Sequence, residues 1–328
     1  MKKTRKNREN RADGKNRKNR KNPKNRKAFQ KKYRDAGMPL GSYDVLYAVF
    51  HVSLHPFALP HLLRALSTII VDFFYIQFAV KNRWRKIPVV SVDHPLDNLI
   101  PFKPQEVSVY FDFITFWGRA LAMTLKVFGT TRGLPIVMRF LDNFTLLYKS
   151  ALRIYHTVMT TTFRPPFDEK KYPLLVTVRK SDPHLLCVPS LHISVMALMC
   201  SFYRDVFRHA ASRTSNRALK SQYDELMTEI YNGAIEISES VLYVKQHSVN
   251  CIPAALFMMC SVLGDIFTKD NALDFIDALF TDRTDIAAAD KLKIRDHLHY
   301  VFERMILETC YEDDWAVTVR RYIKTYKA

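Results

Sequence analysis

Long runs of apolar residues recur between residues 61 and 268, and each has the length of a helix that crosses a membrane. The clearest run is 61–80, where Arg64 and Asp72 are the charged side chains. The others are 107–128, 135–159, 189–207, 228–245 and 248–268. The run at 228–245 contains three glutamates, which in a spanning helix have to face the bundle interior. The pattern predicts an all-α membrane helix bundle of about six spanning helices.

Two flanking segments show different patterns. Residues 43–58 are apolar but are broken by Pro56 and followed by Pro60, so we expect a short interfacial or re-entrant helix. Residues 269–328 are charged, and their apolar residues recur at helical spacing. This spacing predicts amphipathic, water-exposed C-terminal helices with a role in packing or association. The chain thus divides into a tail at 1–36, a membrane-embedded domain at 43–268 and this C-terminal region.

Basic charge is concentrated in the tail. Residues 1–36 hold 17 lysines and arginines against three acidic residues, whereas the other 292 residues are nearly balanced. The tail has almost nothing apolar to bury, so we expect it to be disordered and to attach to an anionic membrane surface. Nucleic-acid binding is the alternative. The absence of any aromatic residue before Phe29 weighs against base stacking and makes nucleic acid an unlikely partner.

The distribution of basic residues between the runs predicts an orientation. The segment 204–220 contains five lysines and arginines, as is typical of a cytoplasmic loop. With the tail also inside, the loops at 81–106, 160–188 and 246–247 fall outside. The basic cluster between Lys81 and Lys86 disagrees with this orientation. The alternative to a membrane protein is a large soluble helical globule.

The cysteines predict neither disulfides nor a metal site. There are five of them, an odd number, and none shows C-x-x-C spacing. We therefore expect no bound metal and no cofactor.

Two short stretches carry the candidate chemistry. Residues 187–192 (Cys-Val-Pro-Ser-Leu-His) open one apolar run, and residues 240–247, which end in Lys-Gln-His, lead into the last run. In the predicted topology His192 and His247 lie at the same face of the membrane. A helix that opens with Pro-Ser offers free backbone amides to a phosphate group. Two nearby imidazoles allow one to attack phosphorus while the other protonates the leaving oxygen.

These stretches resemble motifs of the type 2 phosphatidic acid phosphatase superfamily, in particular its inositol-phosphorylceramide-synthase-like branch. Residues 189–192 match that family's Pro-Ser-x-His motif, and Ser240 precedes His247 by the family's spacing. Arg164-Pro165 matches the end of the family's first motif, and residues 97–102 resemble an outer-loop segment of the branch. The resemblance covers roughly residues 60–268.

The resemblance implies a role for each matched residue. His247 would be the nucleophile that takes up the phosphoryl group, and His192 the general acid toward the leaving alcohol. Ser190 would hold phosphate oxygens, and Arg164 would be a bidentate phosphate clamp. Ser240 and Lys245 would complete the phosphate-binding set.

The chain departs from the family pattern at three positions. Cys251 stands where the family has the aspartate that orients the nucleophilic histidine. Asn250 beside it would still be able to accept a hydrogen bond. Thr157 replaces a lysine of the first motif, and Val241 replaces the arginine that follows the third-motif serine.

The leading functional hypothesis is a phosphatase of lipid phosphates or a phospho-head-group transferase that works through a phosphohistidine. The resemblance implies a bacterial cytoplasmic membrane location, with both termini cytoplasmic and the active site facing outward. One alternative is a catalytically degenerate membrane protein that binds lipid head groups or a partner. The other is a soluble, basic helical protein that associates with RNA.

Overall fold

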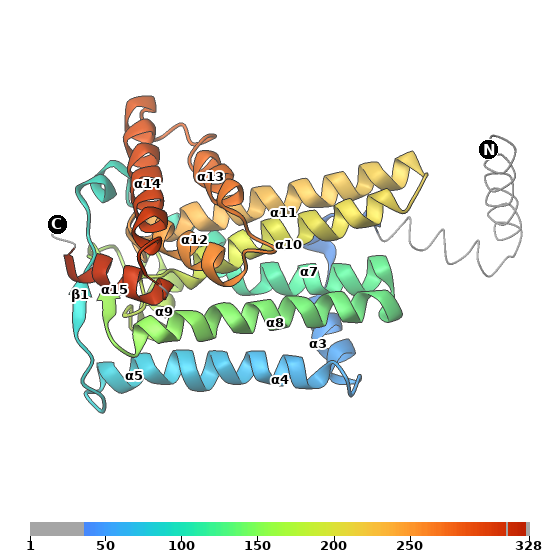
Figure 1. The fold of residues 1–328 in the computed structure, drawn as a ribbon, viewed down its shortest axis with the longest axis horizontal. Helices are drawn as coiled ribbons and strands as arrows, with labels where there is room; N and C mark the ends of the chain where they lie inside the picture. Colours follow the sequence, from blue (N-terminus) through green and yellow to red (C-terminus); the bar gives the residue numbers. More distant parts are fainter. Residues whose placement is uncertain (1–35, 313, 326–328) are drawn as a thin grey trace, which may run out of the picture.

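The structure, a computed structural model, describes residues 36–312 and 314–325 (Figure 1). Helices make up most of this part, which confirms the expected all-α class. Residues 1–35 lie outside it, so the disorder and membrane attachment expected of the basic tail stay predictions.

Long helices run side by side along the longest axis and form the body of the molecule (Figure 1). Side-chain caps specify where several of them begin. The Ser190 side chain accepts a hydrogen bond from the Ile193 amide, and the Asn216 side chain accepts hydrogen bonds from the Ala218 and Leu219 amides. The helices of the body are α3 (Val45–Ser53), α4 (Leu59–Ser67), the π-helix η2 (Thr68–Phe74), α5 (Tyr75–Lys81), α6 (Val107–Phe111), α7 (Phe113–Phe128), α8 (Thr130–Tyr155), α10 (Leu191–Ser212), α11 (Arg217–Tyr243) and α12 (Cys251–Val262).

Each predicted apolar run contains a helix, and the segment 43–58 contains the short helix α3. The six-span prediction is not confirmed, however. Among the described residues, one helix is long and apolar enough to cross a membrane, namely the continuous helix Leu59–Lys81. The run at 248–268 gives a helix of 12 residues and α7 has 16, so both are short for a span, and the longer helices α8, α10 and α11 are not apolar enough.

Small residues let the body helices approach closely. A Cβ added at Gly233 of α11 would lie 2.4 Å from the Phe116 ring of α7. One added at Gly118 of α7 would lie 2.7 Å from the Val45 side chain of α3. Real atoms do not come this close, so a larger residue at either position would push two helices apart.

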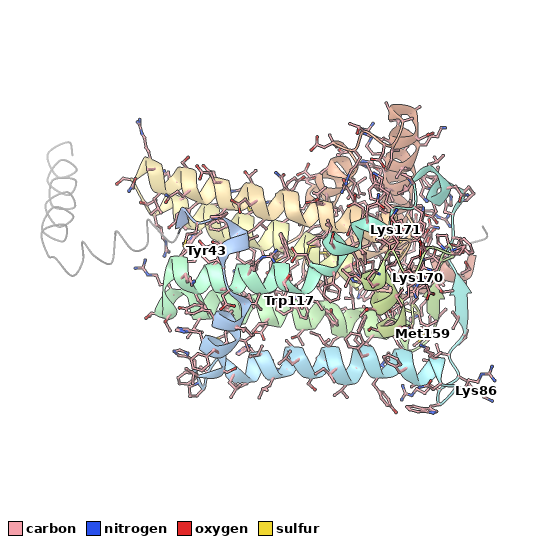
Figure 2. The ribbon with its side chains drawn as sticks, turned by 180° about the vertical axis from the view of Figure 1, so that it is seen from behind. Tyr43, Lys86, Trp117, Met159, Lys170 and Lys171 are labelled. Carbon is pink, nitrogen blue, oxygen red and sulfur yellow. The ribbon has the colours of Figure 1, made fainter. Side chains whose placement is uncertain are left out.

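One end of the body carries the irregular structure. There, strand β1 (Val89–Ser91) pairs in parallel with β2 (Met159–Thr161), close to α9 (Pro173–Ser181). The short 3-10 helices η3 (Pro95–Leu99) and η4 (Pro104–Glu106) lie between β1 and α6 along the chain, and η1 (Leu40–Ser42) precedes α3. Lys86, Lys170 and Lys171 all lie toward this end (Figure 2). The loops 81–106, 160–188 and 246–247, which were predicted to share one membrane face, therefore lie at the same end of the body.

The C-terminal region forms α13 (Lys269–Ala278), α14 (Ala288–Thr309) and α15 (Trp315–Thr325), as its periodicity predicted. Helix α14 lies across the direction of the body helices rather than along it (Figure 1). Its buried face contains Leu298, Val301 and Phe302, and it packs against α12. These helices lie at the end of the body that carries β1 and the loops.

Candidate active site

The two candidate histidines meet although 55 residues separate them in the sequence. His192 is the second residue of α10, and His247 lies in the loop between α11 and α12. Because α10 begins and α11 ends at the same end of the body, their side chains converge. His192 Nδ1 lies 3.2 Å from His247 Nε2. Ser190 Oγ lies 3.4 Å from the same nitrogen of His247.

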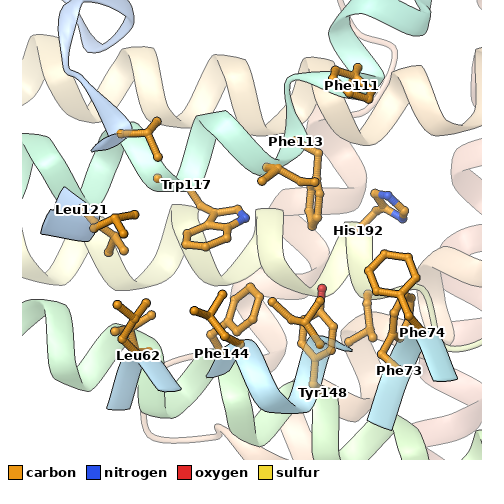
Figure 3. A pocket seen from close by; sticks show the side chains of 18 of the residues that line it. Leu62, Phe73, Phe74, Phe111, Phe113, Trp117, Leu121, Phe144, Tyr148 and His192 are labelled. Atoms are coloured by element: carbon orange, nitrogen blue, oxygen red, sulfur yellow. The ribbon is translucent and has the colours of Figure 1, made fainter. Parts of the chain in front are cut away.

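His192 faces an apolar cavity of about 470 Å³ on its other side. Its ring packs against Tyr110 and Phe113, with centroid distances of 5.0 and 4.5 Å. Figure 3 shows His192 at one end of this cavity, with Leu62 and Leu121 toward the other. The walls are contributed by α3, the helix Leu59–Lys81, α6, α7, α8, α9 and α10. The cavity is therefore suited to an apolar chain whose end reaches the histidine pair.

A much smaller polar cavity, of about 20 Å³, lies on the other side of the pair. Phe73, Asp182, Leu191 and His192 line both cavities. The smaller one is further lined by Gln77, His184, Cys187, Gln246 and His247. This volume is about that of one water molecule. A phosphoryl group thus enters only if the side chains around it move.

Buried nitrogens without a hydrogen-bond partner gather around this polar cavity. Three belong to residues that line it, namely Nε2 of Gln77, Nε2 of Gln246 and Nδ1 of His247, and the fourth is Nε of Arg164, whose guanidinium bonds Gln246. Gln77 and Gln246 are each only 1% exposed. Leaving a buried donor unpaired costs about 1–3 kcal/mol, so such donors suit a site that takes an anionic oxygen.

Arg164 reaches the site through Gln246, whose side-chain oxygen accepts a hydrogen bond from its guanidinium. Two further hydrogen bonds of 3.3 Å run from the guanidinium to the Asp182 carbonyl, and the Asp182 carboxylate lies 3.8 Å away. Burial raises the pKa of Asp182, and the charge of Arg164 opposes that shift. Arg164 is therefore held beside the pair, with its Nε still unpaired.

Two of the predicted phosphate ligands lie elsewhere. The Ser240 hydroxyl is buried in α11 and donates to the Ile237 carbonyl at 2.7 Å. Lys245 Nζ donates to the carbonyls of Asp97 and Ile100, at 2.5 and 2.6 Å. The spacing of these residues matches the family motif, but Lys245 holds the loop that contains residues 97–102.

Cys251 and Asn250 do not contact the His247 ring in the way the family's aspartate would. The Cys251 thiol is buried, hydrogen bonds with the Cys187 thiol and accepts a 3.4 Å hydrogen bond from the Ser248 amide. The Asn250 side chain is directed toward other partners. The His247 Nδ1 atom is left without a carboxylate.

Burial holds the pKa of His247 well below its ordinary value of 6.5, and the neighbouring His192 and His184 act in the same direction. The Cys187 backbone carbonyl opposes the shift. His247 is consequently a neutral imidazole at neutral pH, the form that can act as a nucleophile.

Four residues that line this site were not predicted from the sequence: Gln77, Gln246, Asp182 and His184. Gln77 had a detectable signal, because it is the one amide side chain in the apolar run 61–80. A polar residue within a membrane-like run is a functional candidate. Asp182 and His184 lie in a polar loop, where nothing in the sequence pattern distinguishes them.

Within residues 36–312 and 314–325, no group of three or more His, Cys, Asp or Glu side chains is arranged to hold a metal ion. Comparison of the chain with protein-family models, curated proteins and solved structures gives no match. Its function has to be inferred from the site itself.

Proposed function

We propose that the protein is a membrane enzyme that transfers the phosphoryl group of a lipid phosphate, or a phospho-head-group, through a phosphohistidine at His247. One observation carries the proposal: the 3.2 Å contact between His192 and His247 closes the end of an apolar cavity of about 470 Å³. An acyl chain fits the cavity, and its phosphate would then lie at the histidine pair.

The chemistry divides between the two rings. His247 Nε2 attacks phosphorus, and the bond from phosphorus to the lipid oxygen breaks. His192, in its protonated imidazolium form, which the charge of a bound phosphate favours, gives its Nδ1 proton to that oxygen and becomes neutral, so the alcohol leaves neutral. Water or another alcohol then attacks phosphorus, the phosphorus–nitrogen bond to His247 breaks, and the proton of the attacking hydroxyl passes to the now neutral His192. The 3.2 Å contact fits these roles, since one nitrogen has to carry the proton and the other the lone pair.

Phosphate binding requires the two rings to separate. His192 borders both cavities, so a turn toward the apolar cavity would open space for a phosphoryl group. The free amides at the start of α10, Ser190 and the unpaired nitrogens of Arg164 and Gln246 would take its oxygens.

A membrane location is supported by the helix Leu59–Lys81, which has several exposed apolar side chains along its length. Ile70 and Val71 are 62% and 56% exposed, unlike residues of a buried core helix. Exposed apolar residues also border the cavity, among them Val49 and Ile114. A lipid could therefore enter from the apolar surface. The full topology of six spans, cytoplasmic termini and an outward-facing site in a bacterial cytoplasmic membrane is part of the proposal. So is attachment of the basic tail to anionic lipid.

The second candidate is a membrane protein that binds lipid head groups without turnover. It is favoured by the missing carboxylate, because His247 Nδ1 has no acidic partner and Cys251 contacts Cys187 instead. Loss of an orienting carboxylate can lower a rate by about 10⁴-fold.

Turnover of two phosphate esters tests the proposal. His247→Ala should abolish hydrolysis of a lipid phosphate and of p-nitrophenyl phosphate. His192→Ala should lower hydrolysis of the lipid phosphate by about 100-fold or more, but affect the nitrophenyl ester much less, because that leaving group needs no proton. The exposed His209→Ala is the matched control.

Cys251→Asp, compared with Cys251→Asn, distinguishes the two candidates. Restoring the carboxylate should raise the rate about tenfold or more. If neither the unaltered protein nor Cys251→Asp turns over either ester, the enzyme proposal is wrong and the binding candidate replaces it.

A further inference from the structure

The loop between α11 and α12 that carries His247 is held on several sides by its own polar side chains. Lys245 is bonded to the carbonyls of Asp97 and Ile100. Gln246 accepts from Arg164. The next polar side chain after the histidine is Ser248, whose hydroxyl accepts from the Asn250 amide at 3.3 Å. His247 itself lines the small polar cavity and contacts Ser190 and His192.

Asn250 ends this loop and is fully buried. Its Nδ2 donates to the Val92 carbonyl at 3.1 Å, which identifies the other side-chain atom as the oxygen. That oxygen accepts two hydrogen bonds, from Tyr322 at 2.8 Å and from His297 Nε2 at 2.9 Å. All three bonds are of good length, so Asn250 joins three distant segments of the chain.

Both donors to this oxygen come from the C-terminal helices. His297 lies on α14 and Tyr322 on α15, 47 and 72 residues beyond Asn250. Burial, together with the nearby His94, lowers the pKa of His297 to about 4. His297 is therefore neutral at neutral pH, and the bond to Asn250 specifies the tautomer with its proton on Nε2.

A second contact links α14 to the same loop. The His297 ring stacks on the His94 ring, with centroids 4.1 Å apart. His94 caps η3, and within η3 Asp97 accepts a 2.8 Å hydrogen bond from the Val249 amide. The C-terminal helices thus reach the His247 loop both directly through Asn250 and indirectly through His94 and Asp97.

We propose that Tyr322 and His297 are positioning residues for His247: through the Asn250 oxygen, the C-terminal helices set where the imidazole lies against His192. The C-terminal region then completes the active site, beyond the packing or association expected of it. The inference rests on the proposed function for the reaction that the positioned ring performs.

The expected effect falls on the chemical step. Displacement of a reacting group by about 1 Å can cost about 100-fold in rate. Loss of one of the two hydrogen bonds to the Asn250 side-chain oxygen should therefore lower kcat by about three- to tenfold. KM should stay within about twofold, because neither residue lines the apolar cavity or the phosphate site.

The experiment pairs each positioning residue with a control on α14. Tyr322→Phe is compared with Tyr300→Phe, since Tyr300 is 61% exposed. His297→Leu is compared with His299→Leu, since His299 bonds the exposed Asp277 at 2.8 Å. kcat and KM are measured in the full-length protein well below the melting temperature of the least stable variant, so a loss of stability alone does not lower kcat.

Rescue and coupling sharpen the test. His297→Gln keeps an amide donor and should retain more activity than His297→Leu. The double variant Tyr322→Phe/His297→Leu should lose less than the product of the two single losses, because both act through one oxygen. Unchanged kcat in both single variants, or equal losses in the Tyr300 and His299 controls, would overturn the proposal.

A readout without turnover separates this inference from the proposed function. In protein labelled with ¹⁵N-histidine, the His247 signals, assigned with His247→Gln, should shift in Tyr322→Phe but not in Tyr300→Phe. A shift without any turnover would support positioning while the enzyme proposal fails. Absence of a shift in Tyr322→Phe contradicts the positioning role whether or not the protein turns over lipid.

Discussion

At the residue scale, the site depends on the burial of polar side chains that in most proteins are exposed to water. His247 is kept neutral by burial and by two neighbouring histidines, so the ring is prepared to attack but not to carry charge. Its Nδ1 has no side-chain acceptor, and the Cys187 carbonyl is the one described contact that favours the imidazolium. In the proposed mechanism, His247 can therefore attack phosphorus but lacks an acidic partner that would stabilise the imidazolium.

His184 gives the stability of the protein a dependence on pH. Burial, with the charge of Arg164, lowers its pKa from 6.5 to about 3. The unfolded chain therefore binds the proton more readily, and the stability that comes from neutral His184 is fully present above about pH 6.5 and is lost as the pH falls toward 3. Between pH 7 and 5 the loss should be about 2 kcal/mol. Melting curves of the unaltered protein and of His184→Gln at both pH values check this; an equal loss in the variant would contradict it.

At the element scale, the two cavities adjoin where the helix Leu59–Lys81 changes from α-helix to π-helix. The π-helix η2 carries Phe73 and Phe74 against the apolar cavity, and Phe73 also lines the polar one. Insertions of π-helix commonly occur at functional sites, since the wider turn redirects side chains. Helices α4, α7 and α8 supply the far walls, so the length of the cavity is determined by packing between helices.

Blocking the far end of the cavity should change selectivity for chain length. Leu121 lies at that end, away from His192 (Figure 3), and Leu121→Trp would fill space that a long acyl chain occupies. Losing burial of about two methylene groups should raise KM for a long-chain lipid phosphate about tenfold and leave a short-chain substrate nearly unchanged. Leu146→Trp on the exposed side of α8 is the control. Equal effects on both chain lengths would show that the cavity does not hold the chain.

At the scale of the whole molecule, an apolar surface and a charged C-terminal region are present in one chain. The exposed apolar residues are most concentrated on α3, on the helix Leu59–Lys81 and in the loop between them. In water this surface would be unfavourable, whereas a bilayer would cover it. The turn between α10 and α11, which is rich in arginine, lies at the opposite end of the body from β1 (Figure 1). Lys86, Lys170 and Lys171 lie at the β1 end (Figure 2), so both ends of the body carry basic side chains, and the proposed orientation rests on this turn and on the basic tail.

Carbonate extraction of membranes should leave the protein in the pellet. Peripheral proteins are released by this treatment, whereas a protein with a lipid-facing helix such as Leu59–Lys81 is retained. Ile70→Lys/Val71→Lys, which places two charges on the exposed face of that helix, should increase the released fraction. Full release of the unaltered protein would contradict a membrane-spanning arrangement, and with it the route proposed for lipid entry.

The sequence by itself determined the helices and the pair of histidines. Apolar runs with caps such as Ser190 specify helices locally, and the predicted order of helices and loops placed His192 and His247 at the same end. Only the tertiary structure decided which nearby polar groups share that end. Lys245 binds backbone carbonyls, Asn250 binds α14 and α15, and Gln77 joins the site. The physical reason is that a hydrogen-bond partner is a matter of distance in space, and these partners lie tens to more than a hundred residues apart in the chain.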